Sequence, residues 1–216
     1  MGFKNVFSIT VDNASSNDTA IKYFKKKILS WGTTAVRSKY LHVRCFAHIL
    51  NLIVQDGLKE VSVSMKKVRE SVRYTRNSPT RLRKFKELTD LVGVDSKASL
   101  CLDVPTRWNS TYVMLKTACL YEKVFDKYDK TESAFRADLA NEVPYIFYWH
   151  YINAMVECLK QFYEMTLRIS SSKYVTSNTF FNEVSDLYYV LDDWIKSSDD
   201  SIINMGINMK AKFDKY

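Results

Sequence analysis

The stretch Val6–Asp18, VFSITVDNASSND, decides how the beginning of this chain folds. Its apolar residues at positions 7, 9 and 11 alternate with hydroxyl side chains, which is the period of two typical of a half-buried β-strand. Polar turn formers follow, and those at positions 15–18 can cap a helix that begins near Thr19. Asp12 is therefore expected at the carboxyl end of a strand, the edge at which ligands and active sites collect in open α/β sheets.

Asp12 allows two interpretations. A carboxylate fixed at a strand end can bind a divalent metal ion, provided that other carboxylates arrive from elsewhere in the fold. Aspartate at a strand end is also common turn chemistry, in which the side chain only caps the turn. The local sequence leaves both interpretations open.

The sequence changes character near residue 58. Before that point, a helix at Thr19–Ser30, a polar link at 33–40, a second strand at Leu41–Arg44 and a helix at Phe46–Leu58 follow the first strand. This order predicts an α/β unit over residues 1–58. Two strands do not make a stable sheet on their own, so partner strands are expected from another segment or another chain.

Residues 59–216 predict a mainly α-helical region, which makes the chain predominantly helical overall. Ser78-Pro79 is a favourable helix start, with serine as the cap and proline at the first position. Residues 131–143 are polar and predict an irregular or weakly helical segment. The predicted helices are Val61–Tyr74, 79–91, Thr106–Tyr128, 144–169, Asn178–Lys196 and a last one capped by residues 198–200. In the helix Asn178–Lys196, Phe181 is predicted to be buried.

The composition favours long helices and excludes a membrane protein. The chain has 216 residues, of which 46% are hydrophobic, with only 5 Gly and 3 Pro, so it can bury a core. No stretch approaches the roughly 18 apolar residues of a membrane span, and no membrane partner is expected. Four widely spaced cysteines predict reduced, intracellular thiols. The net charge of +8 permits a nucleic-acid partner without requiring one.

The segment Lys59–Glu87 carries most of this positive charge. It holds ten basic and three acidic residues, a balance of +7. Such a dense basic face suits phosphate contacts, although a solvated helix face is the alternative interpretation. The predicted DNA-binding side chains in this segment are Arg73, Arg76, Arg81, Arg83 and Lys84.

Cys45 and His48 have the Cys-x2-His spacing of half a metal site. A structural zinc site needs four ligands, and no second Cys/His pair follows in the sequence. A buried cysteine and a hydrogen-bonded histidine at the start of a helix is therefore the favoured interpretation.

Arg107 and Trp108 form the other unusual pair, within the run 103–111, DVPTRWNST. At a corner between an extended segment and a helix, the tryptophan can stack on a base or fill a core. The arginine can hold a phosphate or a carboxylate. The pair alone does not decide between these roles.

Five stretches, in this order, resemble the transposases of the hAT superfamily, and most of all the plant ricesleeper and daysleeper type with a BED zinc finger. They are TVDNASSND, RCFAHILNLIVQDGL, LDVPTRWNSTYVML, YVTSNTFFNEV and MKAKFDKY. The resemblance covers essentially the whole chain. It implies an RNase H-like fold interrupted by a helical insertion, so that residues 1–58 would be part of the core and 59–216 the insertion. It also implies an active site of two Asp and one Glu that binds two divalent metal ions, Mg²⁺ or Mn²⁺.

The resemblance assigns roles to particular residues of this chain. Asp12 matches the second catalytic aspartate and would be a remnant metal ligand. Cys45 and His48 match a Cys-x2-His motif where the core runs into the insertion. Arg107 and Trp108 match an Arg-Trp motif implicated in handling DNA near the cut.

The first catalytic aspartate and the BED finger are expected before this stretch of sequence, and the glutamate and dimerisation region after it. We therefore expect this chain alone to be catalytically incomplete and to leave the metal ions unbound. DNA is the expected partner, the nucleus the expected location, and a homodimer is expected of the full-length protein. Two other hypotheses remain open: a helical protein-interaction module that binds no nucleic acid, and a metal nuclease completed by another chain.

Overall fold

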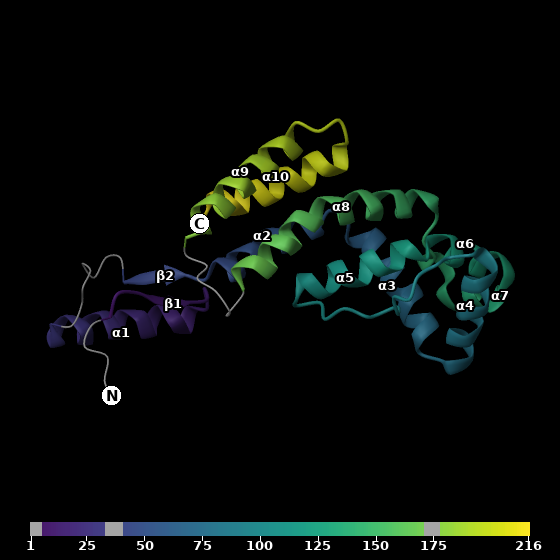
Figure 1. Ribbon diagram of the computed structural model, residues 1–216, viewed down its shortest axis with the longest axis horizontal. Coiled ribbons are helices and arrows are strands. Elements are labelled where there is room, and N and C mark those ends of the chain that lie inside the picture. The colour runs from purple at the N-terminus through teal and green to yellow at the C-terminus, as the bar shows by residue number, and fades with distance from the viewer. Residues whose placement is uncertain (1–5, 33–40, 171–177) are drawn as a thin grey trace. The chain divides into compact units, whose positions relative to one another are not determined.

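The computed structural model describes residues 6–32, 41–170 and 178–216 (Figure 1). Within these ranges the chain is predominantly helical, as predicted, with ten α-helices, one 3-10 helix and a sheet of two strands. No described helix is both long and apolar enough to cross a membrane. The chain divides into two compact units, residues 1–52 with Tyr216 and residues 53–215. The predicted boundary after residue 58 stays a prediction.

The first unit contains a strand-helix-strand sequence and the beginning of a second helix. β1 and β2 are parallel, with Ile9 paired to His42 and Val11 to Arg44. The amide of Cys45 extends the pairing by donating to the carbonyl of Val11 at 2.9 Å. Both predicted strands are therefore present. That they belong to an RNase H-like fold stays a prediction. The elements are β1 (Ile9–Val11), α1 (Ser15–Trp31), β2 (His42–Arg44) and α2 (Phe46–Leu58).

Helix α1 begins earlier than its sequence predicts. It starts at Ser15, so the polar residues at 15–18 lie in its first turn instead of capping it. It ends at Gly32, whose φ of 62° is the left-handed conformation that glycine adopts without strain. The predicted link at 33–40 lies outside the described residues.

The second unit is a helical assembly. In Figure 1, α3, α4, α6 and α7 gather at one end of it, while α9 and α10 form an antiparallel pair. Ser78 caps α4 as predicted, because its hydroxyl accepts the amide of Arg81 at 3.5 Å. The elements are α3 (Ser62–Arg76), α4 (Pro79–Val92), α5 (Trp108–Leu120), α6 (Glu122–Thr131), α7 (Ser133–Leu139), η2 (Ala140–Glu142), α8 (Ile146–Ile169), α9 (Phe180–Ile195) and α10 (Asp200–Asp214).

Two expectations for this unit are wrong. The single helix predicted over 106–128 is broken at Tyr121, whose φ of −108° and ψ of 15° end α5 and start α6. The break allows α5 to pack against α8 while α6 packs against α4. Phe181, predicted to be buried in α9, is 77% exposed.

The core of the second unit lies between α3, α5 and α8. Val72 of α3, Leu115 of α5 and Ile152 of α8 are all fully buried. Helix α10 approaches α2 at Gly57, where a Cβ atom would lie only 2.5 Å from the sulfur of Met209. Glycine therefore sets how closely these two helices pack.

Candidate nucleic-acid interface

Asp12 lies at the carboxyl edge of the β1–β2 sheet, as predicted. Its Oδ1 accepts the backbone amide of Ala14 at 3.0 Å and the side-chain amide of Asn17 at 2.5 Å. The hydrogen bond from Ala14 is the main cause that lowers the pKa of Asp12, and Asn17 and the nearby charge of His48 add to it. The Asp12 side chain thus caps the turn after β1, and its carboxyl group stays ionised at neutral pH.

Cys45 and His48 flank the same edge at the start of α2, and both side chains are half-buried. The sheet positions Cys45 through its amide, while His48 acts on the carboxylate of Asp12 through its charge. Within the ranges that the structure describes, no three His, Cys, Asp or Glu side chains come together around a possible metal ion.

The described residues therefore do not fit the two-metal group that the resemblance implies. Mg²⁺ and Mn²⁺ need several oxygen ligands held in a fixed geometry. Asp12 brings one carboxylate to this edge, and that carboxylate already accepts two hydrogen bonds. No catalytic step is assigned to it.

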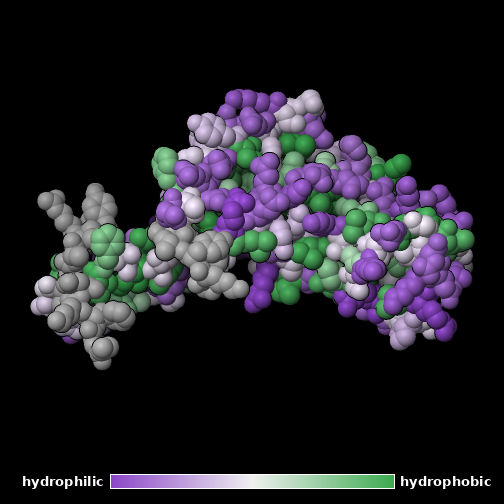
Figure 2. All heavy atoms as spheres, viewed as in Figure 1, coloured by the Kyte–Doolittle hydropathy of each residue, from purple (hydrophilic) through white to green (hydrophobic). Residues whose placement is uncertain are grey.

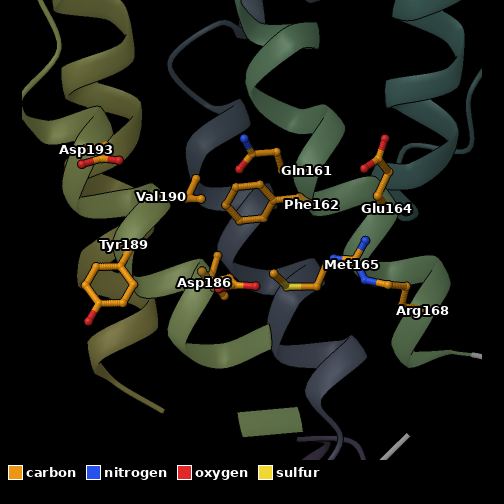
Figure 3. A pocket seen from close by; sticks show the side chains of 10 residues that line it. Gln161, Phe162, Glu164, Met165, Arg168, Asp186, Tyr189, Val190 and Asp193 are labelled. Carbon is orange, nitrogen blue, oxygen red and sulfur yellow. The ribbon is translucent and has the colours of Figure 1, made fainter. Parts of the chain in front are cut away.

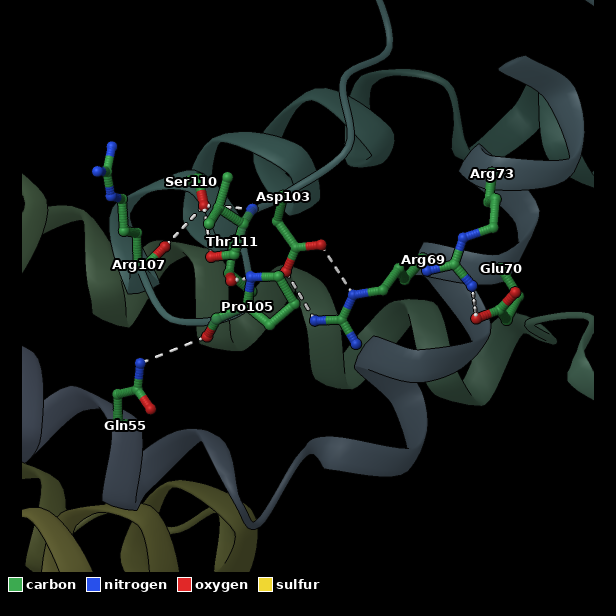
Figure 4. A network of polar contacts seen from close by, with 10 residues as sticks. Gln55, Arg69, Glu70, Arg73, Asp103, Pro105, Arg107, Ser110 and Thr111 are labelled. Atoms are coloured by element: carbon green, nitrogen blue, oxygen red, sulfur yellow. Dashed lines mark hydrogen bonds and ion pairs between the residues drawn. The ribbon is translucent and has the colours of Figure 1, made fainter. Parts of the chain in front are cut away.

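The corner between residues 103 and 111 is held by a buried ion pair (Figure 4). Arg69 of α3 donates two hydrogen bonds to Asp103, at 2.8 and 2.7 Å, and the hydroxyl of Thr111 donates a third at 2.8 Å. The Asp103 side chain is only 1% exposed. Burial by itself raises the pKa of Asp103, but the hydrogen bonds from Arg69 and Thr111 outweigh it and leave the pKa below its ordinary value.

Ser110 fixes the rest of the corner. Its hydroxyl donates to the carbonyl of Arg107 at 2.7 Å and accepts the amide of Val104 at 2.8 Å. Gln55 of α2 adds a long hydrogen bond of 3.5 Å to the carbonyl of Pro105. These contacts tie down the backbone on both sides of Arg107.

The corner separates the two side chains of the Arg-Trp pair. Trp108 is 2% exposed and packs against the rings of Tyr112 and Tyr163. It takes the core-filling role, so the predicted DNA contact of Trp108 has no exposed surface on which to act. Arg107 is exposed and extends away from Asp103 in Figure 4, without an ion-pair partner in the described part of the chain.

Most of the basic residues between Lys59 and Glu87 are already neutralised. Six of the ten form ion pairs with carboxylates. Among the predicted DNA-binding residues, Arg73 pairs with Glu70 through a short hydrogen bond. Arg81 pairs with Asp138 at 2.9 Å and lies over the ring of Tyr74. Lys84 pairs with Glu132 at 3.3 Å.

Three exposed cations of the same segment have no carboxylate partner among the described residues: Arg76, Arg83 and Lys86. Arg76 ends α3, while Arg83 and Lys86 lie three residues apart on α4 and so share one helix face. In the space-filling view, hydrophilic residues cover much of the end formed by α4, α6 and α7 (Figure 2). Lys86 belongs to the basic segment that the sequence predicts to face DNA, although it is not among the five side chains singled out there.

A pocket between α8 and α9 has the opposite charge (Figure 3). Carboxylates of Glu164, Asp186 and Asp193 stand around an apolar floor that includes Phe162. Arg168, which also lines the pocket, is bound to Glu183 by two hydrogen bonds of 2.6 and 2.9 Å. An acidic rim repels phosphate, so this pocket is unsuited to nucleic acid.

Comparison with known proteins identifies the family of this chain. The family model described as the ZBED1 RNase-like helical domain matches residues 43–158, more than half of the chain. The putative AC transposase of Zea mays is 30% identical over 214 residues, which are 99% of this chain and 26% of that protein. The zinc finger BED domain-containing protein RICESLEEPER 2 of Oryza sativa subsp. japonica is 31% identical over 212 residues, 98% of this chain and 29% of that protein. DAYSLEEPER of Arabidopsis thaliana is 25% identical over 211 residues, 98% of this chain and 30% of that protein.

These similarities place the chain in the class of transposase-like proteins. The chain belongs to the family of the ZBED1 RNase-like helical domain, and its resemblance to hAT transposases of the ricesleeper and daysleeper type is confirmed. It spans less than a third of the length of these relatives. The activity and partners of a whole protein are therefore not carried over to it directly.

Proposed function

We propose that this chain is a DNA-binding part of a transposase-like protein. It contacts the phosphate backbone through exposed cations at the end of α3 and on α4. The observation that supports this proposal is the set of cations without carboxylate partners in the described structure: Arg76, Arg83, Lys86 and, at the 103–111 corner, Arg107.

The chemistry of these side chains suits phosphate. Guanidinium groups bind phosphate oxygens through two parallel hydrogen bonds, whereas an ammonium group acts as a compact point charge. Such contacts position a protein on DNA without reading its sequence. The expected binding is therefore salt-dependent and weakly sequence-specific. The proposal also places the protein in the nucleus, where its DNA partner lies.

A titration of double-stranded DNA with the chain tests the proposal. The logarithm of the association constant is expected to fall linearly with the logarithm of the salt concentration, by about 0.9 for each phosphate contact. Fluorescence anisotropy of a labelled duplex measures this dependence. Absence of binding at low salt would contradict the proposal.

The Arg-Trp pair is expected to respond to mutation in two separate ways. Trp108→Phe lowers the free energy of unfolding by about 1–2 kcal/mol, because it leaves a cavity in a packed core, and does not change DNA affinity. Arg107→Ala changes the free energy of unfolding by less than about 0.5 kcal/mol. It lowers the salt slope, which is the fall in the logarithm of the DNA association constant per unit of the logarithm of the salt concentration, by about 0.9. Urea unfolding and anisotropy measure the two effects. A smaller salt slope in folded Trp108→Phe would indicate that the tryptophan contacts DNA and would contradict this prediction.

A second candidate function is a protein-interaction module. It is favoured by the start of α8, where Tyr145, Ile146 and Phe147 are 52%, 83% and 59% exposed. Adjacent exposed apolar side chains of this kind mark association surfaces. The DNA titration separates the candidates, since this second function predicts no duplex binding at low salt and association that survives nuclease treatment.

A further inference from the structure

The turn between α3 and α4 holds the one serine or threonine of the sequence that is followed by proline. Pro79 follows Ser78, whereas each of the other two prolines follows a valine. Proline-directed protein kinases select a hydroxyl residue followed by proline, and many of them also select a basic residue two positions after that proline. Arg81 occupies this position in the run 78–81, SPTR. The sequence therefore carries the full recognition pattern of such a kinase.

The structure presents Ser78 in a conformation that suits a kinase cleft. Its backbone is extended, with φ of −139° and ψ of 128°, as is usual for a residue that precedes proline. Ser78 is half-buried, but the two residues on each side of it are exposed. Since the ends of helices fray, the first turn of α4 can loosen and let a kinase bind residues 76–81.

The hydroxyl group of Ser78 is available for reaction. It accepts the amide of Arg81 in a long hydrogen bond of 3.5 Å, and among the described residues it donates none. Thr75 of α3 differs, because it is fully buried and its hydroxyl donates to the carbonyl of Ser71 at 2.9 Å. The proton of Thr75 is thus already engaged, whereas the proton of Ser78 can pass to a base.

Two arginines lie close to Ser78 in the chain. Arg76 ends α3 two residues before it, is exposed and has no carboxylate partner in the part of the chain that the structure describes. Arg81, in the first turn of α4, pairs with Asp138, and the two side chains are 36% and 51% exposed. Such a surface pair contributes little to stability, so Arg81 can exchange its carboxylate for a phosphate. The first turn of a helix also favours an anion at its start.

We propose that Ser78 is a phosphorylation site of a proline-directed kinase, and that its phosphate binds Arg76 and Arg81. The hydroxyl oxygen of Ser78 attacks the γ-phosphorus of ATP, so that a new O–P bond forms while the bond between the γ-phosphorus and the β-phosphate oxygen breaks. ADP leaves, and the hydroxyl proton passes to the catalytic aspartate of the kinase. The product carries about −1.5 to −2 charges at neutral pH.

The phosphate acts on DNA binding in two ways. Arg76 is one of the cations of the proposed DNA interface, and a phosphoserine that binds it removes one contact with DNA. The same negative charge repels the DNA phosphates that approach α4. This regulation rests on the proposed function, whereas the modification of Ser78 and its contacts with the two arginines do not.

Incubation of the folded chain with a cyclin-dependent kinase, ATP and Mg²⁺, followed by tandem mass spectrometry, tests the modification. We expect one phosphate, on Ser78. Pro79→Ala keeps the hydroxyl but removes the recognised proline, and is expected to slow phosphorylation at least about tenfold. Thr80→Ala removes the neighbouring hydroxyl and is the control, which should be phosphorylated like the wild type. An unmodified Ser78 in the wild type would overturn the inference.

Phosphorus NMR of the modified chain tests the contacts with the arginines in the absence of DNA. Phosphoserine ordinarily loses its second proton with a pKa of about 6. Because neighbouring guanidinium groups favour the dianion, we expect a lower pKa for the phosphate on Ser78. The double variant Arg76→Ala, Arg81→Ala should raise this pKa back towards the ordinary value. A phosphate that titrates at the ordinary value in the folded wild type would overturn the inference.

Anisotropy titrations of a labelled duplex then measure the effect on DNA binding. Phosphorylation is expected to lower the salt slope by at least about 0.9, which is one phosphate contact. An unchanged salt slope in a modified chain that binds the duplex would overturn the regulation. If the unmodified chain binds no duplex at low salt while the phosphate on Ser78 titrates with a lowered pKa, the DNA-binding proposal is contradicted and the modification site stands.

Discussion

Replacing Asp103 with alanine is expected to lower the free energy of unfolding by about 3–5 kcal/mol. The Asp103 carboxylate is 1% exposed and receives two hydrogen bonds from Arg69 and one from Thr111. Its removal leaves the guanidinium of Arg69, whose side chain is 17% exposed, without its anion. Because whole domains are stable by only about 5–15 kcal/mol, this is a large share of the total.

Urea unfolding of Asp103→Ala and Arg69→Ala measures the effect. The matched control is Arg73→Ala, which lies on the same helix one turn further along and loses an exposed ion pair with Glu70. Such a pair contributes less than about 1 kcal/mol. Equal losses in Arg69→Ala and Arg73→Ala would contradict the structural role of the buried pair.

The same variants have a pH signature. The pKa of Asp103 is lowered in the folded chain, so its contribution to stability is present above the unfolded value, near 3.8, and is lost as pH falls through the lower folded value. Wild-type protein should therefore lose this increment in acid below about pH 4. The stability of Asp103→Ala should therefore fall less than that of the wild type over the same range of acid pH.

The second large effect concerns DNA. The triple variant Arg76→Ala, Arg83→Ala, Lys86→Ala is expected to lower the salt slope by about 2.7, which is three contacts at 0.9 each. Within the part of the chain that the structure describes, these side chains can turn to phosphate without breaking an ion pair. The cations that pair with Glu70, Asp138 and Glu132 must first give up those partners.

The matched control is therefore the triple variant Arg73→Ala, Arg81→Ala, Lys84→Ala. It removes the same three positive charges from the same two helices. Since those charges are already neutralised by carboxylates, the expected fall in salt slope is less than about 1. Circular dichroism confirms that both variants are folded before their DNA affinities are compared.

Local signals in the sequence predicted much of the secondary structure. Phe46–Leu58 is a helix with the predicted bounds, and Ser78-Pro79 starts α4 because capping depends on neighbouring residues alone. The break at Tyr121 was not predictable in this way. The apolar period continues through it, and only packing against two different helices divides α5 from α6.

The candidate interface was less predictable, because charge pairing is a tertiary property. The sequence shows a balance of +7 between Lys59 and Glu87, but Asp103, Glu132 and Asp138, which neutralise part of it, lie outside that segment. Likewise, the sequence allowed Trp108 either to stack on a base or to fill a core. Only its burial in the structure favours the core.

The most direct test compares the two triple variants in one experiment. Anisotropy titrations of a labelled duplex at several salt concentrations give the slope of the logarithm of the association constant for the wild type and both variants. We expect the slope to fall by about 2.7 when Arg76, Arg83 and Lys86 are replaced and by less than about 1 when Arg73, Arg81 and Lys84 are replaced. Equal slopes in the two variants, or a wild-type chain whose affinity does not depend on salt, would contradict DNA binding through Arg76, Arg83 and Lys86.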